Sequence, residues 1–380
     1  MKKRLISLCL LFAMLLSLSL TAQASIESLG EISTEEPVLS KESAVADRLE
    51  DMIFHFYCDV PGQYTVGDAI EIYNADTEAV YYMIPIFRGQ ECVGLAEMSN
   101  DGDITLTDGI SLYDNIIALD YPNSLLYTTG GVVYGERPGT VVPLYDFNFN
   151  ISANSAFVQA TFAEKAAEIA AYTETALESM DIAAVVTQIE AVNVFAPEVS
   201  LMGAVPTVET DQCPITNFVP QNGYLICWAA CIATIANYKK GLSLTAEAVA
   251  TAMGHNYTDD QYAGAKVKAV VDAFALYGMT YSEYSAKLGW TQVKSNIANR
   301  SPFIMGITRS VVLPDGTIGR VGHMMTGYGY NCNYGDAEAD SGARYIRVWD
   351  PYGAHFYWQY NADYYRIGGY LWEWSHTFID

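Results

Sequence analysis

The fold of the C-terminal half (residues 208–380) is decided by the stretch Gln221-Asn222-Gly223-Tyr224-Leu225-Ile226-Cys227-Trp228-Ala229-Ala230-Cys231. From Cys227 onward, mostly apolar residues recur at the spacing of one helix face as far as Tyr238, and Gly241 stands where a helix often ends. This pattern predicts a helix that begins at Cys227. In the first turn of a helix, the macrodipole and the free backbone N–H groups favour a thiolate, so Cys227 is a candidate nucleophile.

Three further residues could complete a nucleophilic site around Cys227. Gln221 precedes it by six residues, on a loop from which its side-chain amide and the Cys227 backbone N–H could hold a developing oxyanion. His323 follows a glycine in a strand-like run, and Asp350 opens a turn before Pro351. A histidine can take the thiol proton, and a carboxylate can fix the tautomer of its ring.

These motifs resemble those of the papain-like cysteine peptidases, most closely the secreted bacterial branch that includes the staphopains, with its Cys-Trp-Ala-Ala start. Gln221 and Cys227 match the family's oxyanion glutamine and nucleophile. Gly322-His323 matches its histidine, and Asp350 its third member. The resemblance covers residues 213–380. It implies a papain-like catalytic domain that hydrolyses protein or peptide substrates through a thioester without a cofactor. The sequence departs from papain in having an aspartate rather than an asparagine at the third position.

Each candidate also has a plain structural interpretation. Cys227 could be a buried thiol or half of a disulfide, and His323 could be a packed strand histidine. Asp350 could simply cap its turn, and Gln221 could be a surface polar residue. The remaining histidines have no matching context and are expected to be structural: His55, His255, His355 and His376.

Two other classes of function use the same residues. A transglutaminase-like acyltransferase or a cell-wall amidase would form the same thioester with the same Cys-His-Asp order, and a catalytically inactive papain-like protein would only bind. The position of Gln221 favours the peptidase. No zinc-type Cys/His spacing, phosphate-binding loop or dinucleotide fingerprint occurs, so no metal or cofactor site is expected.

The order of elements predicts an α+β fold. In the C-terminal half, helices are expected from 227 and over 245–253, 259–277 and 291–298, and antiparallel strands over 303–308, 318–320, 323–330, 345–349 and 355–360. Upstream, we expect a helix over 44–57, strands over 69–73, 79–87 and 92–98, β or loop structure over 127–145, and a long helix over 155–180. Pro85 places its strand towards a sheet edge.

The N-terminus predicts export. Lys2, Lys3 and Arg4 are followed by an apolar run over 5–20 and by Ala22-Gln23-Ala24, which is typical of a cleavage site. Residues 1–24 are therefore expected to be a signal peptide, with a retained membrane anchor as the alternative. The mature protein is then bacterial and secreted, either extracellular or held at the cell surface, and does not enter a membrane.

Charge divides the exported chain into two parts. Residues 25–207 carry 29 acidic and 5 basic residues, whereas residues 208–380 carry 15 and 12. The division predicts an acidic, β-rich pro-domain over 25–207 before a peptidase domain over 208–380, joined by a cuttable linker over 195–213. The pro-domain would inhibit the peptidase by covering its cleft; an independent binding domain is the alternative. The net charge of −24 disfavours a nucleic-acid partner.

The exported chain has six cysteines: Cys58, Cys92, Cys213, Cys227, Cys231 and Cys332. If Cys227 is free, five remain, so at least one other thiol is unpaired. Cys231 lies one helical turn from Cys227 and is expected to be a small core residue. Cys58 and Cys92 could form a bridge, but the sequence does not determine the connectivity.

Overall fold

The computed structural model of the chain describes residues 40–119, 125–137, 140–147, 180–194, 208–258, 265–312, 318–333 and 344–380. Residues Lys41–Asp380 belong to one compact unit. The predicted signal peptide, the long helix expected over 155–180 except for its last residue, and residues 195–207 of the linker lie outside the described residues. The remainder of the linker was expected to be weakly structured but contains the strand Val208–Gln212. Among the helices that are described, none is long and apolar enough to cross a membrane.

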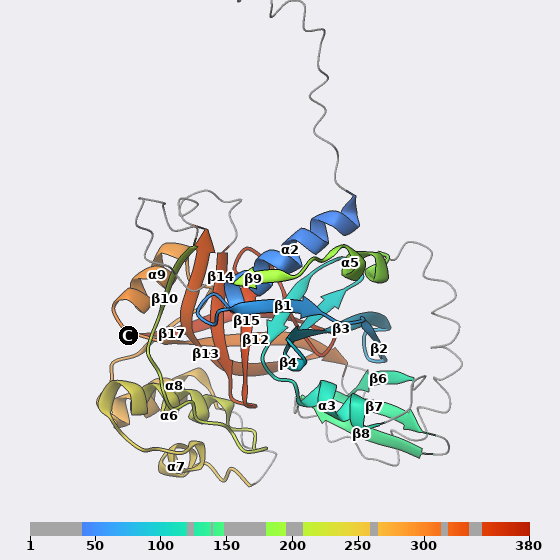
Figure 1. Ribbon diagram of the computed structural model, residues 1–380. Coiled ribbons are helices and arrows are strands. Elements are labelled where there is room, and N and C mark those ends of the chain that lie inside the picture. The colour runs from blue at the N-terminus through green and yellow to red at the C-terminus, as the bar shows by residue number, and fades with distance from the viewer. Residues whose placement is uncertain are drawn as a thin grey trace, which may run out of the picture. The chain divides into compact units, whose positions relative to one another are not determined.

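The described part is an α+β structure with a large, mostly antiparallel sheet, which confirms the predicted fold class (Figure 1). Its strands are β1 Gly62–Val66, β2 Ile70–Asn74, β3 Ala79–Arg88, β4 Glu91–Ser99, β5 Ile104–Thr107, β6 Leu126–Thr129, β7 Val132–Arg137, β8 Thr140–Asp146, β9 Val192–Val194, β10 Val208–Gln212, β11 Ser282–Tyr284, β12 Phe303–Val312, β13 Ile318–Asn333, β14 Arg344–Asp350, β15 Ala354–Gln359, β16 Tyr365–Ile367 and β17 Tyr370–Ile379. The described helices are α2 Lys41–Phe56, α3 Ser111–Ala118, α5 Ile182–Gln188, α6 Cys227–Lys240, α7 Ala246–Ala252, α8 Val267–Leu276 and α9 Trp290–Ala298.

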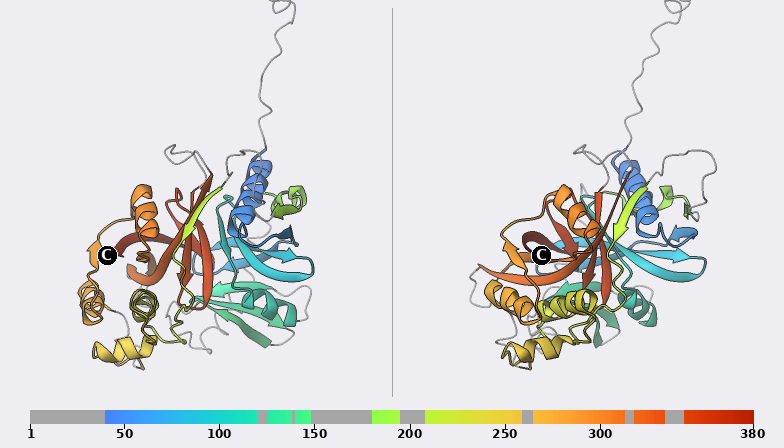
Figure 2. Two further views of the ribbon diagram at one scale, coloured as in Figure 1. Left: turned by 60° about the vertical axis from the view of Figure 1, so that its left-hand side comes forward. Right: turned by 90° about the vertical axis from the view of Figure 1, so that its left-hand side faces the viewer.

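One ladder of strands runs through both halves of the molecule. Its order is β11–β17–β12–β13–β14–β15–β5–β4–β3–β2–β6–β7–β8, and only the β2–β6 pair is parallel. The N-terminal half, residues 41–194, joins the C-terminal half at the antiparallel pair β5–β15, where Leu106 lies opposite Tyr357. In all views, α6, α7 and α8 lie at one end of the C-terminal strands and α2 with α5 at the other (Figures 1 and 2).

Local sequence signals locate most helices correctly. Helix α6 begins at Cys227, and Gly241 ends it in the left-handed conformation with φ of 64°. Thr245 caps α7, because its hydroxyl accepts a hydrogen bond from the Ala248 N–H at 3.2 Å. Helix α8 is shorter than expected, beginning at Val267, and residues 259–264 lie outside the described part.

The expectation for Pro85 is wrong. Strand β3 lies inside the sheet, between β4 on one side and β1 and β2 on the other. Pro85 faces the gap between the end of β1 and the start of β2, where its carbonyl accepts a hydrogen bond from the Gly67 N–H at 2.8 Å. A proline is tolerated there because no ladder bond is needed from its nitrogen.

Buried side chains join the halves into a shared core. One hydrophobic cluster contains Tyr81 and Leu95 of the N-terminal half together with Trp358 and Tyr370 of the C-terminal half. A separate cluster surrounds α6 and includes residues of α7, α8 and β12. Helix α6 is therefore held in place by the C-terminal half itself.

We expect Gly327→Ala to destabilise the protein by about 1–3 kcal/mol, because a Cβ at this position would lie 2.3 Å from the buried ring of Phe303. Gly322→Ala on the same strand is the matched control, since its Cβ would have no neighbour closer than 3.8 Å. Urea unfolding of both variants measures the difference. Equal stability of the two would contradict the packing described here.

Candidate active site

Cys227 occupies the first position of α6. The helix packs against β13, α7 and α8, and its residues from Trp228 to Asn237 are buried. Cys227 itself is half-buried, so its thiol is reachable from the surface. Lys239 and Lys240 lie in the last turn, where positive charge complements the helix dipole. The core therefore fixes the thiol in space and leaves it accessible.

His323 and Asp350 form a buried pair. His323 Nε2 lies 2.9 Å from Asp350 Oδ1, and the two residues are 5% and 1% exposed. The β13–β14 ladder brings them together, because Thr326, shortly after His323 on β13, pairs with Trp349, the residue before Asp350. The Tyr352 N–H donates a second hydrogen bond to Asp350 Oδ1 at 3.0 Å. The carboxylate is thereby oriented from two sides.

The Cys227 thiol is the second side chain that hydrogen-bonds to His323. Burial alone would disfavour the imidazolium, but the charge of Asp350 and its hydrogen bond, together with Cys227, raise the pKa of His323 to about 10. Because Nε2 faces Asp350, Nδ1 is the ring nitrogen left for the thiol. The order Cys227–His323–Asp350 is the arrangement that a thiolate–imidazolium nucleophile requires.

Aromatic side chains enclose the histidine. Tyr352 stacks on the His323 ring with centroids 5.1 Å apart and planes 14° apart. Trp372, on β17, meets the ring edge-on at 6.4 Å. Sequence reasoning assigned no role to these two residues; Tyr352 carries a local signal, being two residues beyond Asp350 in the same turn, whereas Trp372 carries none.

Gln221 lies beside the turn that follows Asp350. Its backbone N–H donates to the Pro351 carbonyl at 2.9 Å, and its side-chain Nε2 donates to the Tyr224 carbonyl of its own loop. The side chain is buried, and its Oε1 has no hydrogen-bond partner among the described residues. Nε2 carries a second hydrogen that an oxyanion could accept, so a role for Gln221 as oxyanion donor stays a prediction.

The other five cysteines in the described part of the chain are free thiols. Burial raises the pKa of each, to about 12 for Cys213 and about 11 for Cys332. Cys231 is fully buried, in line with the interpretation as a core residue. Cys58 and Cys92 are not bridged in this structure.

The remaining histidines lie in packing environments. His255 meets Trp228 at 4.9 Å, and His55 lies 3.4 Å from Asp51. His355 Nδ1 lies 2.9 Å from the Tyr328 hydroxyl. In the described part of the chain, His, Cys, Asp and Glu side chains do not gather into any group of three or more that would suit a metal ion.

Comparison with known proteins extends over the part of the chain that holds the site. Residues 215–373 match the model of the Peptidase_C39 like family, and this stretch contains all four candidate residues. Among solved structures, the chain is similar to a crystal structure described as a C39-like peptidase from Bacillus anthracis, at 10% identity and a TM-score of 0.29, with 45% of this chain and 98% of the other covered. No curated protein matches the chain.

The family match supports a cysteine peptidase family for the C-terminal half. It does not extend to the staphopain-like branch that the Cys-Trp-Ala-Ala sequence suggested. Nor does it cover the N-terminal half, for which neither the family model nor the curated proteins supply a relative.

The charge of Asp350 predicts a specific change in pH dependence. The thiolate–imidazolium pair exists below the pKa of His323 and is lost as the pH rises through that value, so activity falls on the alkaline side. In Asp350→Asn the charge is gone, and we expect the alkaline limb of kcat/KM to move down by about 1–3 pH units. Asp363→Asn, on the loop between β15 and β16, is the control that should leave the limb in place. An unchanged limb in Asp350→Asn would show that another group controls the titration.

Proposed function

We propose that this protein is a secreted bacterial cysteine endopeptidase that cleaves peptide bonds through Cys227, His323 and Asp350. The observation that carries the proposal is the position of His323, which contacts Asp350 through Nε2 and also hydrogen-bonds to Cys227. Such a histidine can hold the thiol proton and later release it to a leaving group.

The proposed reaction proceeds in two steps. The Cys227 thiolate attacks the peptide carbonyl carbon, and the oxyanion accepts hydrogen bonds from the Cys227 N–H and the Gln221 side chain. Collapse of this intermediate breaks the C–N bond, and the His323 imidazolium gives its proton to the leaving amine. Water then attacks the thioester, loses a proton to His323, and releases the carboxylic acid and the thiol. Asp350 stabilises the imidazolium in both steps without taking its proton.

The papain-like subtype and the staphopain-like branch belong to the proposal as well. They are supported by the spacing of Gln221 and Cys227, by the glycine before His323 and by the turn that begins at Asp350. A transglutaminase-like acyltransferase or a cell-wall amidase would share the thioester and differ in its substrate. The similarity of residues 215–373 to a peptidase family favours hydrolysis of peptides.

We further propose that the enzyme is made as a precursor. The basic, apolar and small-residue segments of 1–24 support export, and the composition of 195–213 supports a cut between the halves. Until that cut, residues 25–207 would restrain the peptidase. The first residue of the secreted form, determined by N-terminal sequencing, tests this step: a start near residues 204–213 agrees with the proposal, and an intact chain of full activity contradicts it.

Substitution of the nucleophile tests the catalytic assignment. In Cys227→Ala, we expect casein hydrolysis to fall by about a million-fold, as for the nucleophile of a comparable triad, and labelling by an epoxide inhibitor of papain-like peptidases to disappear. Self-processing should also stop.

Cys231→Ala is the matched control, because it removes a neighbouring thiol of the same helix that is fully buried. Retention of labelling and casein hydrolysis is expected there. Labelling that survives in Cys227→Ala would refute the assignment, and amine incorporation in place of casein hydrolysis would favour the acyltransferase.

A further inference from the structure

The N-terminal half shares a β-sheet with the C-terminal half. The pair β5–β15 continues the sheet from one half to the other, with Phe356 opposite Thr107 and Trp358 opposite Thr105. At the end of this pair, the Asp108 N–H donates to the His355 carbonyl at 3.2 Å, and the His355 N–H donates to Asp108 Oδ1 at 2.7 Å. The backbone pairing of β5 and β15 is of the kind that joins strands of one domain, and the Asp108 side chain adds to it.

A buried carboxylate forms a second connection. Glu97 of β4 is 4% exposed, and its two oxygens accept hydrogen bonds from the backbone N–H groups of Gly368 at 2.8 Å and Gly369 at 2.7 Å. Asn74 donates to the Gly368 carbonyl at 3.0 Å. A buried charge is costly unless such donors compensate it, so separation of the halves would leave these partners unpaired until water replaced them.

The turn that receives Glu97 is fitted to the N-terminal half. Gly368 and Gly369 have φ of 64° and 78°, as a tight turn between β16 and β17 requires. A Cβ at Gly368 would lie 2.5 Å from Phe147, and one at Gly369 would lie 2.6 Å from Tyr81. The C-terminal turn thus presses its backbone directly against side chains of the other half.

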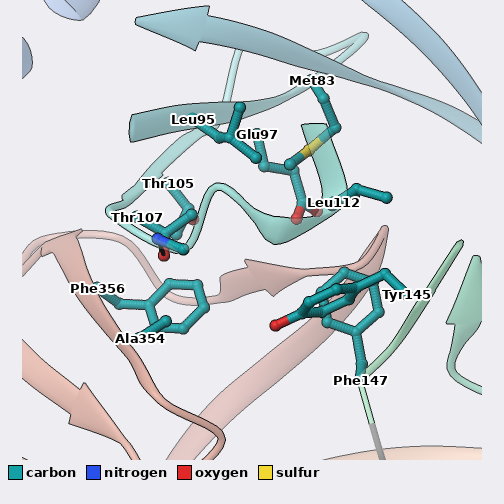
Figure 3. A pocket seen from close by; sticks show the side chains of 11 residues that line it. Met83, Leu95, Glu97, Thr105, Thr107, Leu112, Tyr145, Phe147, Ala354 and Phe356 are labelled. Atoms are coloured by element: carbon teal, nitrogen blue, oxygen red, sulfur yellow. Dashed lines mark hydrogen bonds between the residues drawn. The ribbon is translucent and has the colours of Figure 1, made fainter. Parts of the chain in front are cut away.

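Residues of both halves line a small pocket beside this turn. Figure 3 shows Glu97 and Leu112 of the N-terminal half on one side of it, and Ala354 and Phe356 of β15 on the other side together with Phe147 of the N-terminal half. The side chains that line the pocket are mainly apolar, and Glu97 supplies the one carboxyl group among them. Side chains of both halves therefore line the same pocket.

Helix α2 and the turn after it make a third connection, to strands β13 and β14. Asp51 accepts a hydrogen bond from the Tyr345 hydroxyl at 2.6 Å, and the His55 carbonyl accepts one from the Asn331 side chain at 3.0 Å. Arg347 pairs with Asp59 at 3.1 Å. Together, the three connections act on β13, β14, β15 and the turn before β17.

Two of these connections adjoin the catalytic residues. Strand β15 begins at Ala354, directly after the turn that contains Asp350 and Tyr352, and it pairs with β5. Strand β17 carries Trp372, which packs against His323, and it begins at the turn held by Glu97. The elements that hold the histidine and its carboxylate are thus held in turn by the N-terminal half.

We infer that residues 41–194 remain bound to residues 208–380 after the chain is cut between them, so that the mature enzyme is a two-chain complex. Loss of the N-terminal half would expose the edge of β15 and buried side chains such as Tyr345 and Trp358. This inference extends the proposal that the enzyme is made as a precursor. It rests on that proposal only for the statement that the chain is naturally cut between the two halves. Activation then follows from cutting, without release of the N-terminal half.

A controlled cut of the full chain tests the association. The recognition sequence of a site-specific protease is inserted after Met202 in the full-length protein, which is cut to completion and passed over a size-exclusion column. We expect both fragments to elute together at the volume of the uncut protein. Separation of the fragments, whether the C-terminal one stays soluble or precipitates, overturns the inference.

Variants at the interface test whether Glu97 contributes to the association of the two fragments. In the cut protein, Glu97→Gln replaces one acceptor with a donor facing a backbone N–H, so the fragments should separate at a lower urea concentration than in the cut wild type. Glu91→Gln on the same strand is the control, because this exposed carboxylate pairs with the exposed side chain of Arg88, and it should match the wild type. An identical midpoint for both variants would contradict the role of Glu97.

If Glu97→Gln does not fold, Asp108→Ala replaces it. Asp108 is exposed, and its carboxylate accepts the His355 N–H, so the same decrease in the separation midpoint is expected. Elution does not depend on catalysis. An inactive protein whose fragments stay together therefore counts against the peptidase alone, and a separated C-terminal fragment that still cleaves casein counts against the two-chain enzyme alone.

Discussion

The site depends on one buried ion pair. His323 and Asp350 lie almost entirely out of solvent, where an uncompensated charge on either would be strongly unfavourable. Each therefore requires the other, and the hydrogen bond from the Tyr352 backbone to Asp350 satisfies part of what remains. In this arrangement, Nε2 of the ring is hydrogen-bonded to the Asp350 carboxylate, so Nδ1 is the nitrogen left to interact with Cys227.

The nucleophile is positioned by an independent part of the core. Helix α6 is enclosed by α7, α8 and β13, and its cluster is distinct from the one that spans the two halves. The thiol thus comes from a helical layer and the histidine from a sheet. Contact between the thiol and the imidazole requires β13 to keep its position against α6. Gly327 packs closely against Phe303 of β12, and this contact helps to fix the register of β13 in the sheet.

Sequence reasoning succeeded where the signal was local. The start of α6, its glycine end, the threonine cap of α7 and the α+β class all follow from spacing or from a single side chain. It failed for Pro85, because the gap between β1 and β2 that accommodates a proline is a property of the assembled sheet. It also missed the hairpin of β16 and β17 and the pair β5–β15. Strands β5 and β15 pair across more than two hundred residues, which leaves no periodic trace in the sequence that links them. At the site, Tyr352 could have been noticed from its place beside Asp350, whereas Trp372 reaches His323 only through the fold.

The division of charge also has a structural meaning that composition alone did not indicate. The acidic N-terminal half directs several carboxylates to the C-terminal half: Asp51 to a tyrosine hydroxyl, Asp59 to Arg347, and Glu97 to two backbone N–H groups. Such contacts make the association of the two halves specific, because a carboxylate at an interface is unfavourable unless hydrogen-bond donors of the other surface face it. An excess of acidic residues in one half is therefore compatible with close association, provided that the other half supplies donors at matching positions. The C-terminal half does so with backbone amides at a glycine turn, which no count of lysines and arginines would detect.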